Sequence, residues 1–87
     1  MYQLLYTSLA QKDVKKIKES NLKSKCEELL KIIEKNPYQV PPPYKRLVGE
    51  LRGYISRRIN IKHRLIYKVY EDKKVVKVIR LWTHYSK

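Results

Sequence analysis

The first third of the chain carries apolar residues at helical spacing, behind a short run that is typical of a strand. Residues 2–6 are mostly apolar or aromatic and predict that strand. Thr7 or Ser8 then offers a helix N-cap, with Gln11 three residues beyond Ser8 as in a capping box. We therefore expect a helix over residues 9–19.

A second helix is indicated by apolar residues at positions i, i+4, i+7, i+8 and i+11. This stripe consists of Leu22, Cys26, Leu29, Leu30 and Ile33. Ser20 and Asn21 can cap its start, and Asn36-Pro37 ends it. Residues 37–43 hold four prolines. Because proline fixes φ and moves its preceding residue out of the helical region, they predict an extended connector.

The second half of the chain alternates apolar and polar residues, which predicts strands joined by short turns. The predicted strand runs are residues 46–51, 53–60, 63–70 and 74–85. The segments 60–62 and 71–73 have hairpin-loop length, so consecutive runs should pair antiparallel. The sequence thus predicts a single α+β domain over residues 1–87, with two N-terminal helices packed on a small, mainly antiparallel sheet.

Strand alternation sorts these residues onto two faces, since residues i and i+2 point the same way. The face under the helices is predicted to carry Ile55, Ile59, Leu65, Tyr67, Val69, Ile79 and Leu81. The open face is predicted to carry Tyr54, Ser56, Arg58, Arg64, Ile66, Arg80, Trp82 and His84. Arg57 has the parity of the core, where a guanidinium is rarely buried without a partner, so a sheet edge or a carboxylate would have to accommodate it.

The charge of the chain indicates what this open face would bind. The 21 Lys and Arg against 8 Asp and Glu give a formal net charge of +13, so a polyanion or an acidic protein is the expected partner. The lysines of the first helix are typical of a solvated surface. The strand arginines have a similar alternative, a solvated face held by salt bridges, but the strand half is short of acidic residues.

Composition argues against several other chemistries. Cys26 is the single cysteine, so no internal disulfide can form, and we expect a small core residue in a reducing cytoplasm. The sequence contains neither metal-ligand spacings nor a glycine-rich phosphate loop, so we expect no metal and no cofactor. The first ten residues do not resemble a signal peptide, and no run approaches the roughly 20 apolar residues of a membrane span. We expect a cytoplasmic protein.

The ring-bearing residues near the C-terminus suit chemistry on RNA. Histidine titrates near neutrality, so His84 among arginines can donate a proton to a leaving group beside a phosphate. Trp82 and Tyr85 can stack on unpaired bases, or can simply cap the sheet. His63 begins a strand beside Arg64, and we interpret it as structural.

Four motifs between residues 41 and 85 stand in the order and spacing of one known family. They read Pro-Pro-Pro-Tyr, Leu-Val-Gly-Glu-Leu-Arg-Gly-Tyr, Ser-Arg-Arg-Ile-Asn-Ile-Lys-His-Arg-Leu-Ile-Tyr and Trp-Thr-His-Tyr. Through them nearly the whole chain resembles the YoeB/Txe branch of the RelE/ParE superfamily of toxin–antitoxin toxins, which are ribosome-dependent mRNA endonucleases. The resemblance implies a microbial RNase fold and the toxin of a type II system.

This resemblance also implies a reaction, in which the ribose 2′-hydroxyl attacks the adjacent phosphate without a metal. Arg58 and Arg64 would stabilise the developing charge. His84 would protonate the leaving oxygen, and Tyr85 would place the nucleotide. The further residues expected to contact the substrate are Arg57, Arg80, Trp82 and Lys62. The implied partners are mRNA in the ribosomal A site, the 16S and 23S rRNA, and an acidic antitoxin of the YefM type, with a toxin homodimer or a toxin–antitoxin heterocomplex as the assembly.

One position departs from the family pattern. Where the family carries a glutamate as general base in a Tyr-Glu-Lys-Leu context, this chain reads Tyr-Lys-Arg-Leu, with Lys45 at the glutamate position. A protonated lysine cannot accept a proton. Either Lys45 sheds its proton among neighbouring cations and acts as the base, as lysines are thought to do in the RelE branch, or the nuclease is weakened. Glu50 is the nearest other carboxylate, but it has the opposite strand parity.

Two rival functions would use the same basic surface. One is a non-catalytic module that binds the ribosome or nucleic acid, and the other is a ParE-like toxin directed at DNA gyrase. The binding module would lose affinity gradually with each cation removed, whereas the nuclease would lose activity with His84→Ala or Arg64→Ala and keep its fold. A gyrase-directed toxin would leave mRNA intact.

Overall fold

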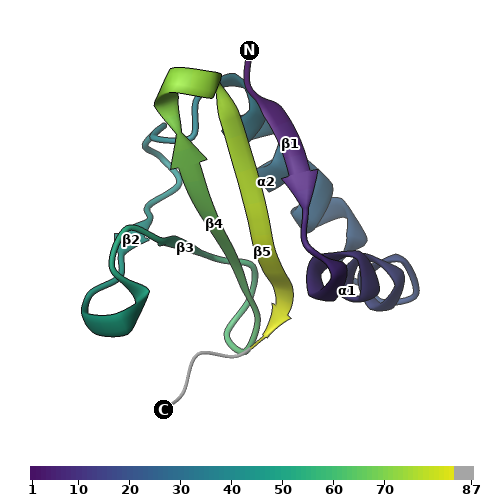
Figure 1. The fold of residues 1–87 in the computed structure, drawn as a ribbon. Coiled ribbons are helices and arrows are strands. Elements are labelled where there is room, and N and C mark those ends of the chain that lie inside the picture. The colour runs from purple at the N-terminus through teal and green to yellow at the C-terminus, as the bar shows by residue number, and fades with distance from the viewer. Residues whose placement is uncertain (84–87) are drawn as a thin grey trace.

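Two helices and one sheet form two layers in the computed structural model, which describes residues 1–83. In chain order the elements are β1 (Gln3–Tyr6), α1 (Ser8–Lys18), α2 (Lys23–Lys35), β2 (Lys45–Arg46), the 3₁₀ turn η1 (Gly49–Leu51), β3 (Ile55–Arg58), β4 (Arg64–Tyr70), the 3₁₀ turn η2 (Glu71–Lys73) and β5 (Val75–Thr83). Both helices cover the same side of the sheet (Figure 1). The predicted α+β class is confirmed.

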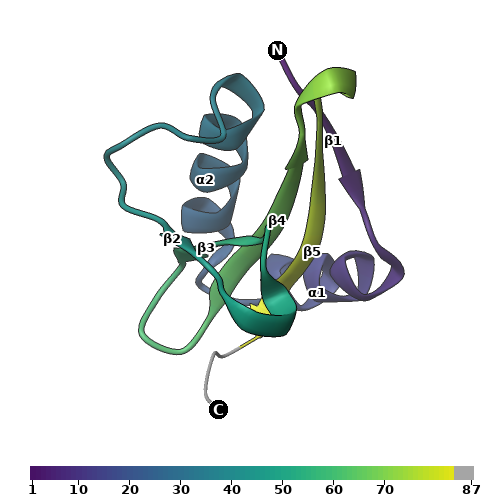
Figure 2. The same ribbon diagram turned by 60° about the vertical axis from the view of Figure 1, so that its left-hand side comes forward.

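The five strands lie in the order β1-β5-β4-β3-β2. All neighbouring pairs are antiparallel except β1 and β5, which are parallel. The predicted antiparallel meander is therefore confirmed for β3, β4 and β5. A parallel pair needs a long crossover, and the chain between β1 and β5 supplies it. Figure 2 shows β4 and β5 as the long central strands, with β1 on one side and β2 and β3 on the other.

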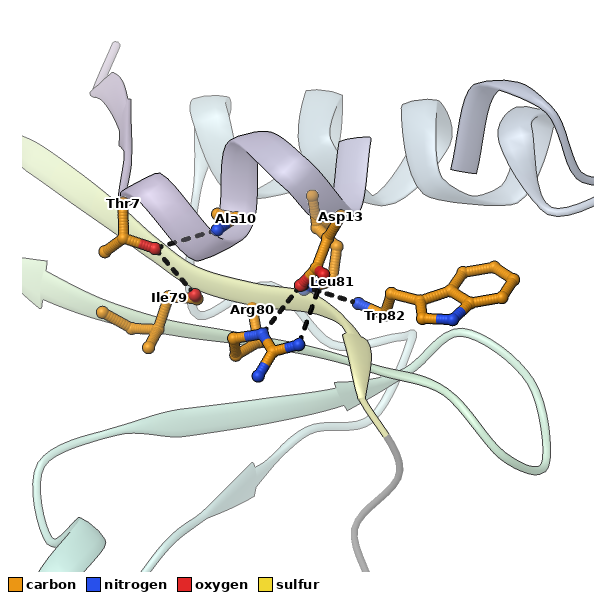
Figure 3. A network of polar contacts seen from close by, with 7 residues as sticks. All are labelled: Thr7, Ala10, Asp13, Ile79, Arg80, Leu81 and Trp82. Atoms are coloured by element: carbon orange, nitrogen blue, oxygen red, sulfur yellow. Dashed lines mark hydrogen bonds and ion pairs between the residues drawn. The ribbon is translucent and has the colours of Figure 1, made fainter. Parts of the chain in front are cut away.

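Helix α1 is capped by Thr7 rather than Ser8. The Thr7 hydroxyl accepts a hydrogen bond from the Ala10 amide at 3.0 Å and donates one to the Ile79 carbonyl at 2.9 Å (Figure 3). The cap therefore also ties α1 to β5. Gln11 does not complete a capping box, because its side-chain amide donates to the Tyr6 carbonyl instead.

Helix α2 buries the apolar stripe predicted for it. Cys26, Leu29 and Ile33 are buried against the sheet. The predicted cap was wrong, since Leu22 precedes the helix without a side-chain hydrogen bond and Ser20 instead closes the turn between the helices. Burial, helped by the charge of the neighbouring Glu27, raises the pKa of the Cys26 thiol to about 11, so this cysteine stays protonated and acts as a small core residue.

Strand β5 changes face part-way along its length. Val76, Val78 and Leu81 are buried in the core, while Ile79 is half-buried. The prediction that Ile79 joins the core was wrong, because the register against β4 shifts by one between the pairs Tyr67↔Val78 and Ile66↔Arg80. A bulge of this kind inserts one residue and reverses the alternation beyond it.

The predicted strand over residues 46–51 was also wrong in extent. The β2 strand ends after two residues, and the chain turns at Gly49 (φ +70°) into η1. Gly53 (φ +95°) then returns the chain to β3. Glycine takes both left-handed conformations without a Cβ penalty, so the two glycines convert an apparent strand into a short loop.

Candidate active site

A cleft of about 270 Å³ opens on the sheet face away from the helices, where β2, β3 and β4 meet the end of the proline segment. It is lined by Pro43, Tyr44, Lys45, Ser56, Arg58 and Arg64. None of these described lining residues is acidic. Three of the residues predicted to be catalytic, Lys45, Arg58 and Arg64, therefore share one hollow with a strongly positive lining.

Strand register explains why these residues converge. Lys45 on β2 pairs with Ser56 on β3, and Arg58 on β3 pairs with Arg64 on β4. Directly opposite residues place their Cβ atoms about 5 Å apart on one face. Two guanidinium groups in opposite positions repel each other, so the arrangement favours an anion that both can contact.

The hairpin loop after β3 holds the arginine pair in register. The Ile59 amide donates to the His63 carbonyl at 2.9 Å, and the Asn60 side chain accepts from the amides of Lys62 and His63 at 2.8 and 2.7 Å. The His63 ring stacks on Trp82, with ring centroids 4.1 Å apart. One face of the Trp82 ring is therefore covered by His63. Lys62, in the same loop, has an exposed side chain.

Arg57 does not belong to the cleft, and the structure corrects its assignment as a substrate contact. Its side chain is 1% exposed on the helix-facing side of β3. The guanidinium donates to the carbonyls of Pro37, Gln39 and Pro42 and to the Tyr67 hydroxyl, at 2.7–3.0 Å. It also lies 5.0 Å from the centre of the Tyr44 ring. The buried arginine thus anchors the proline segment to the sheet.

Arg80 is held by Asp13 of α1, outside the cleft lining. The Arg80 Nε donates to Asp13 Oδ2 at 2.8 Å and its Nη2 to Oδ1 at 3.3 Å. The same carboxylate accepts the amides of Leu81 and Trp82 at 2.9 and 3.1 Å (Figure 3). Asp13 is 1% exposed and fixes β5 just beyond its bulge, so Arg80 acts in an ion pair there.

The Asp13 network should make stability depend on pH. Burial opposes ionisation of Asp13, but the hydrogen bonds from Arg80 and the two amides outweigh it and lower its pKa. A lowered folded-state pKa gives stabilisation that is complete above the unfolded value of about 4 and is lost as the pH falls through the folded value.

Asp13→Asn should therefore destabilise the fold by about 1–3 kcal/mol at pH 7, because a charged acceptor is lost. The difference from the wild type should shrink as the pH is lowered below about 4. Urea unfolding at several pH values measures this. Asp72→Asn, which changes an exposed carboxylate in η2, is the matched control, and an equal effect of both variants would contradict the role given to Asp13.

Sequence reasoning missed two of the residues that shape this region. Asp13 is the only acidic residue among the first 18, a signal that could have suggested a partner on the sheet. Tyr44 lines the cleft with its ring near both Arg57 and Arg46. Glu50 lies exposed in η1 and does not line the cleft. The predicted site residues His84 and Tyr85 lie outside the described part of the chain.

Among residues 1–83, no group of three or more His, Cys, Asp or Glu could hold a metal ion. Within the same described range, none of the helices is both long enough and apolar enough to span a membrane.

A two-helix layer on a five-stranded sheet with this strand order defines the RelE-like toxin fold. The profile of one family, described as YoeB-like toxin of bacterial type II toxin-antitoxin system, matches residues 6–85. The chain belongs to this family. No curated protein matches the chain.

Solved structures agree with this assignment. A YoeB–YefM complex from Staphylococcus aureus contains a chain 32% identical to this one, with a TM-score of 0.81 over 98% of this chain and 99% of that one. A YoeB/ParE toxin from Agrobacterium tumefaciens is 26% identical, with a TM-score of 0.87 over 95% and 99%. YafQ from E. coli, 22% identical with a TM-score of 0.77 over 95% and 93%, shares the fold.

Proposed function

We propose that this toxin is a ribosome-dependent endonuclease that cuts mRNA in the ribosomal A site. The observation that carries the proposal is the convergence of Lys45, Arg58 and Arg64 on one cleft, whose lining among the described residues includes no acidic side chain. An RNA phosphate is the ligand that such a cleft fits, since paired guanidinium groups bind phosphate oxygens with several hydrogen bonds at once.

The cleft residues suit attack of a ribose 2′-hydroxyl on the neighbouring phosphate. Charge builds up on the phosphate oxygens as the new bond forms, and Arg58 and Arg64 would stabilise that charge in a fixed geometry. Lys45 lines the same cleft from β2, opposite Ser56 of β3, and would take the proton of the 2′-hydroxyl once it has lost its own. We propose that His84 protonates the leaving oxygen and that Tyr85 positions the nucleotide.

The partners follow from charge and family. The net charge of +13 suits rRNA and mRNA, and it also suits an acidic antitoxin that neutralises the surface. Relatives crystallised as YoeB–YefM complexes support an antitoxin of the YefM type, and a YoeB dimer from S. aureus supports a homodimer as the free form. We place this activity in the cytoplasm, where translating ribosomes are found.

The direct test is mapping of mRNA ends on ribosomes after induction of the toxin. New 5′ ends at codons in the A site are expected for the wild type and should disappear with His84→Ala. Intact mRNA together with growth arrest would instead indicate the gyrase-directed alternative. Ribosome binding without cleavage would indicate the non-catalytic module, a second candidate that the lysine at position 45 specifically favours.

Lys45→Glu tests the role of that lysine. A carboxylate is ionised at pH 7 and can accept a proton, so the variant should cleave about 100-fold faster if Lys45 is a poor base. Single-turnover cleavage on programmed ribosomes measures the rate. Lys45→Gln, which removes the charge without adding a base, is the control. An unchanged or slower rate for Lys45→Glu would show that the lysine is itself a competent base.

A further inference from the structure

Ser56 presents an unusual combination of burial and missing contacts. The residue lies on β3, is 2% exposed, and its hydroxyl has no hydrogen-bond partner among the residues that the structure describes. Yet Ser56 lines the cleft that holds Lys45, Arg58 and Arg64. A buried hydroxyl without a partner is rare in native proteins and calls for an explanation, such as a bound ligand or water.

The surroundings of Ser56 offer its hydroxyl little else. On β2 it faces Lys45, which is exposed, and on β4 it faces Ile66, which is apolar and buried. Because β3 lies between two strands, the ladders on both sides use its backbone groups. The side-chain oxygen therefore stays available at the floor of the cleft.

Its position relative to the arginines indicates the ligand. Ser56 and Arg58 are two residues apart on one strand, so both point to the open face, and Arg64 faces Arg58 from β4. A tetrahedral phosphate bound by two guanidinium groups has oxygens left over, and one of them can point toward the floor of the cleft. A neutral hydroxyl there adds a donor without adding charge, and in a buried site such a hydrogen bond is stronger than in water.

We propose that Ser56 is a further catalytic residue, which donates its hydroxyl to a non-bridging oxygen of the scissile phosphate beside Arg58 and Arg64. The inference rests on the proposed endonuclease function and adds to it a neutral donor. The proposal predicts that the Ser56 hydroxyl is needed for cleavage and contributes nothing to the stability of the free toxin.

Ser56→Ala tests this in two measurements. Cleavage on ribosomes under single-turnover conditions should fall about 100-fold, as for loss of one donor to a developing negative charge. The melting temperature without RNA should stay equal or rise, because an unpaired buried hydroxyl is replaced by a methyl group. Ser24→Ala, at an exposed serine of α2, is the matched control and should change neither.

A second variant and a modified substrate sharpen the test. Ser56→Cys keeps the shape of the side chain with a slightly larger terminal atom but supplies only a weak donor, so it should fold normally and cleave nearly as slowly as Ser56→Ala. The modified substrate carries sulfur in place of one non-bridging oxygen of the scissile phosphate. One of its two diastereomers should be cleaved more slowly by the wild type, whereas the cleavage rate of Ser56→Ala should not depend on the sulfur. A lower melting temperature with unchanged cleavage would overturn the proposal, since the hydroxyl would then serve the fold.

The proposal can also be decided if the endonuclease assignment fails. Should neither the wild type nor Lys45→Glu cut mRNA, inorganic phosphate becomes the probe, and the amide chemical shifts of Ser56, Arg58 and Arg64 become the readout. The anion contact would be upheld if phosphate shifts these amides in the wild type and if Ser56→Ala binds phosphate with an apparent affinity about tenfold weaker. Equal shifts in both proteins, or none in the wild type, would overturn it.

Discussion

Arg57→Met is expected to destabilise the fold by about 3–5 kcal/mol, most of the folding free energy of a domain this small. The guanidinium donates to the carbonyls of Pro37, Gln39 and Pro42 and to the Tyr67 hydroxyl. Methionine fills a similar volume but supplies no donor, so backbone carbonyls lose their partners in a buried site. The proline segment would then be released from the sheet.

The neighbouring arginine provides a matched control. Arg58 is exposed on the opposite face of β3, so Arg58→Met should change the unfolding free energy by less than about 0.5 kcal/mol. Arg57→Lys should be nearly as destabilising as Arg57→Met, because one ammonium group cannot span three carbonyls as the planar guanidinium does. Urea unfolding followed by circular dichroism measures all three. Equal stability of Arg57→Met and Arg58→Met would contradict the anchoring role.

Arg57 matters to function through the proline segment. Residues 43 and 44, at the end of that segment, form one wall of the cleft. The Tyr44 ring lies near the Arg57 guanidinium, 5.0 Å from centroid to carbon. The buried arginine thus fixes this wall of the cleft from the helix-facing side of β3, while Arg58 and Arg64 line the cleft on the open face. Of the two adjacent arginines in the Ser-Arg-Arg motif, Arg57 therefore holds the fold, and Arg58 is the one for which we propose a role in the reaction.

Much of the fold follows from patterns that act over short distances. The apolar stripe of α2 and the two hairpin loops depend on local spacing, and the structure has them where the sequence predicts them. The same alternation placed Arg58 and Arg64 on the open face, because β3 and β4 are regular across their shared hairpin. Regular strands preserve parity, and parity was the basis of the site prediction.

The errors arose where a long-range contact decides the local geometry. The bulge in β5 takes Ile79 off the core face that alternation assigned to it, and the Asp13 carboxylate of α1 accepts the amides just beyond the bulge. The burial of Arg57 depends on carbonyls 15 to 20 residues away. A sequence pattern carries no record of such partners. Alternation therefore misplaced Ile79, and although it gave Arg57 the parity of the core, it could not identify the carbonyls that hold this side chain there.

Removing Arg64 or Arg58 should have the largest effect on activity. Arg64→Ala and Arg58→Ala should each lower single-turnover cleavage on ribosomes by about 100- to 1000-fold, since each removes a preorganised donor from the charge that develops on the phosphate. Arg64→Lys should recover little, because a point charge does not reproduce the two-pronged contact of a guanidinium. The melting temperature of each variant should stay close to that of the wild type.

Lys16→Ala is the control, because it removes one positive charge from the exposed side of α1, on the other face of the sheet. If the arginines act together on one phosphate, the double variant should lose less activity than the product of the single losses, as expected for groups that work as a unit. A non-catalytic basic surface behaves differently: Lys16→Ala and Arg64→Ala would then weaken ribosome binding to a similar, salt-dependent extent. That outcome would overturn the endonuclease assignment, because charge would matter wherever it lay, whereas catalysis requires it at the two positions that the β3–β4 hairpin brings together.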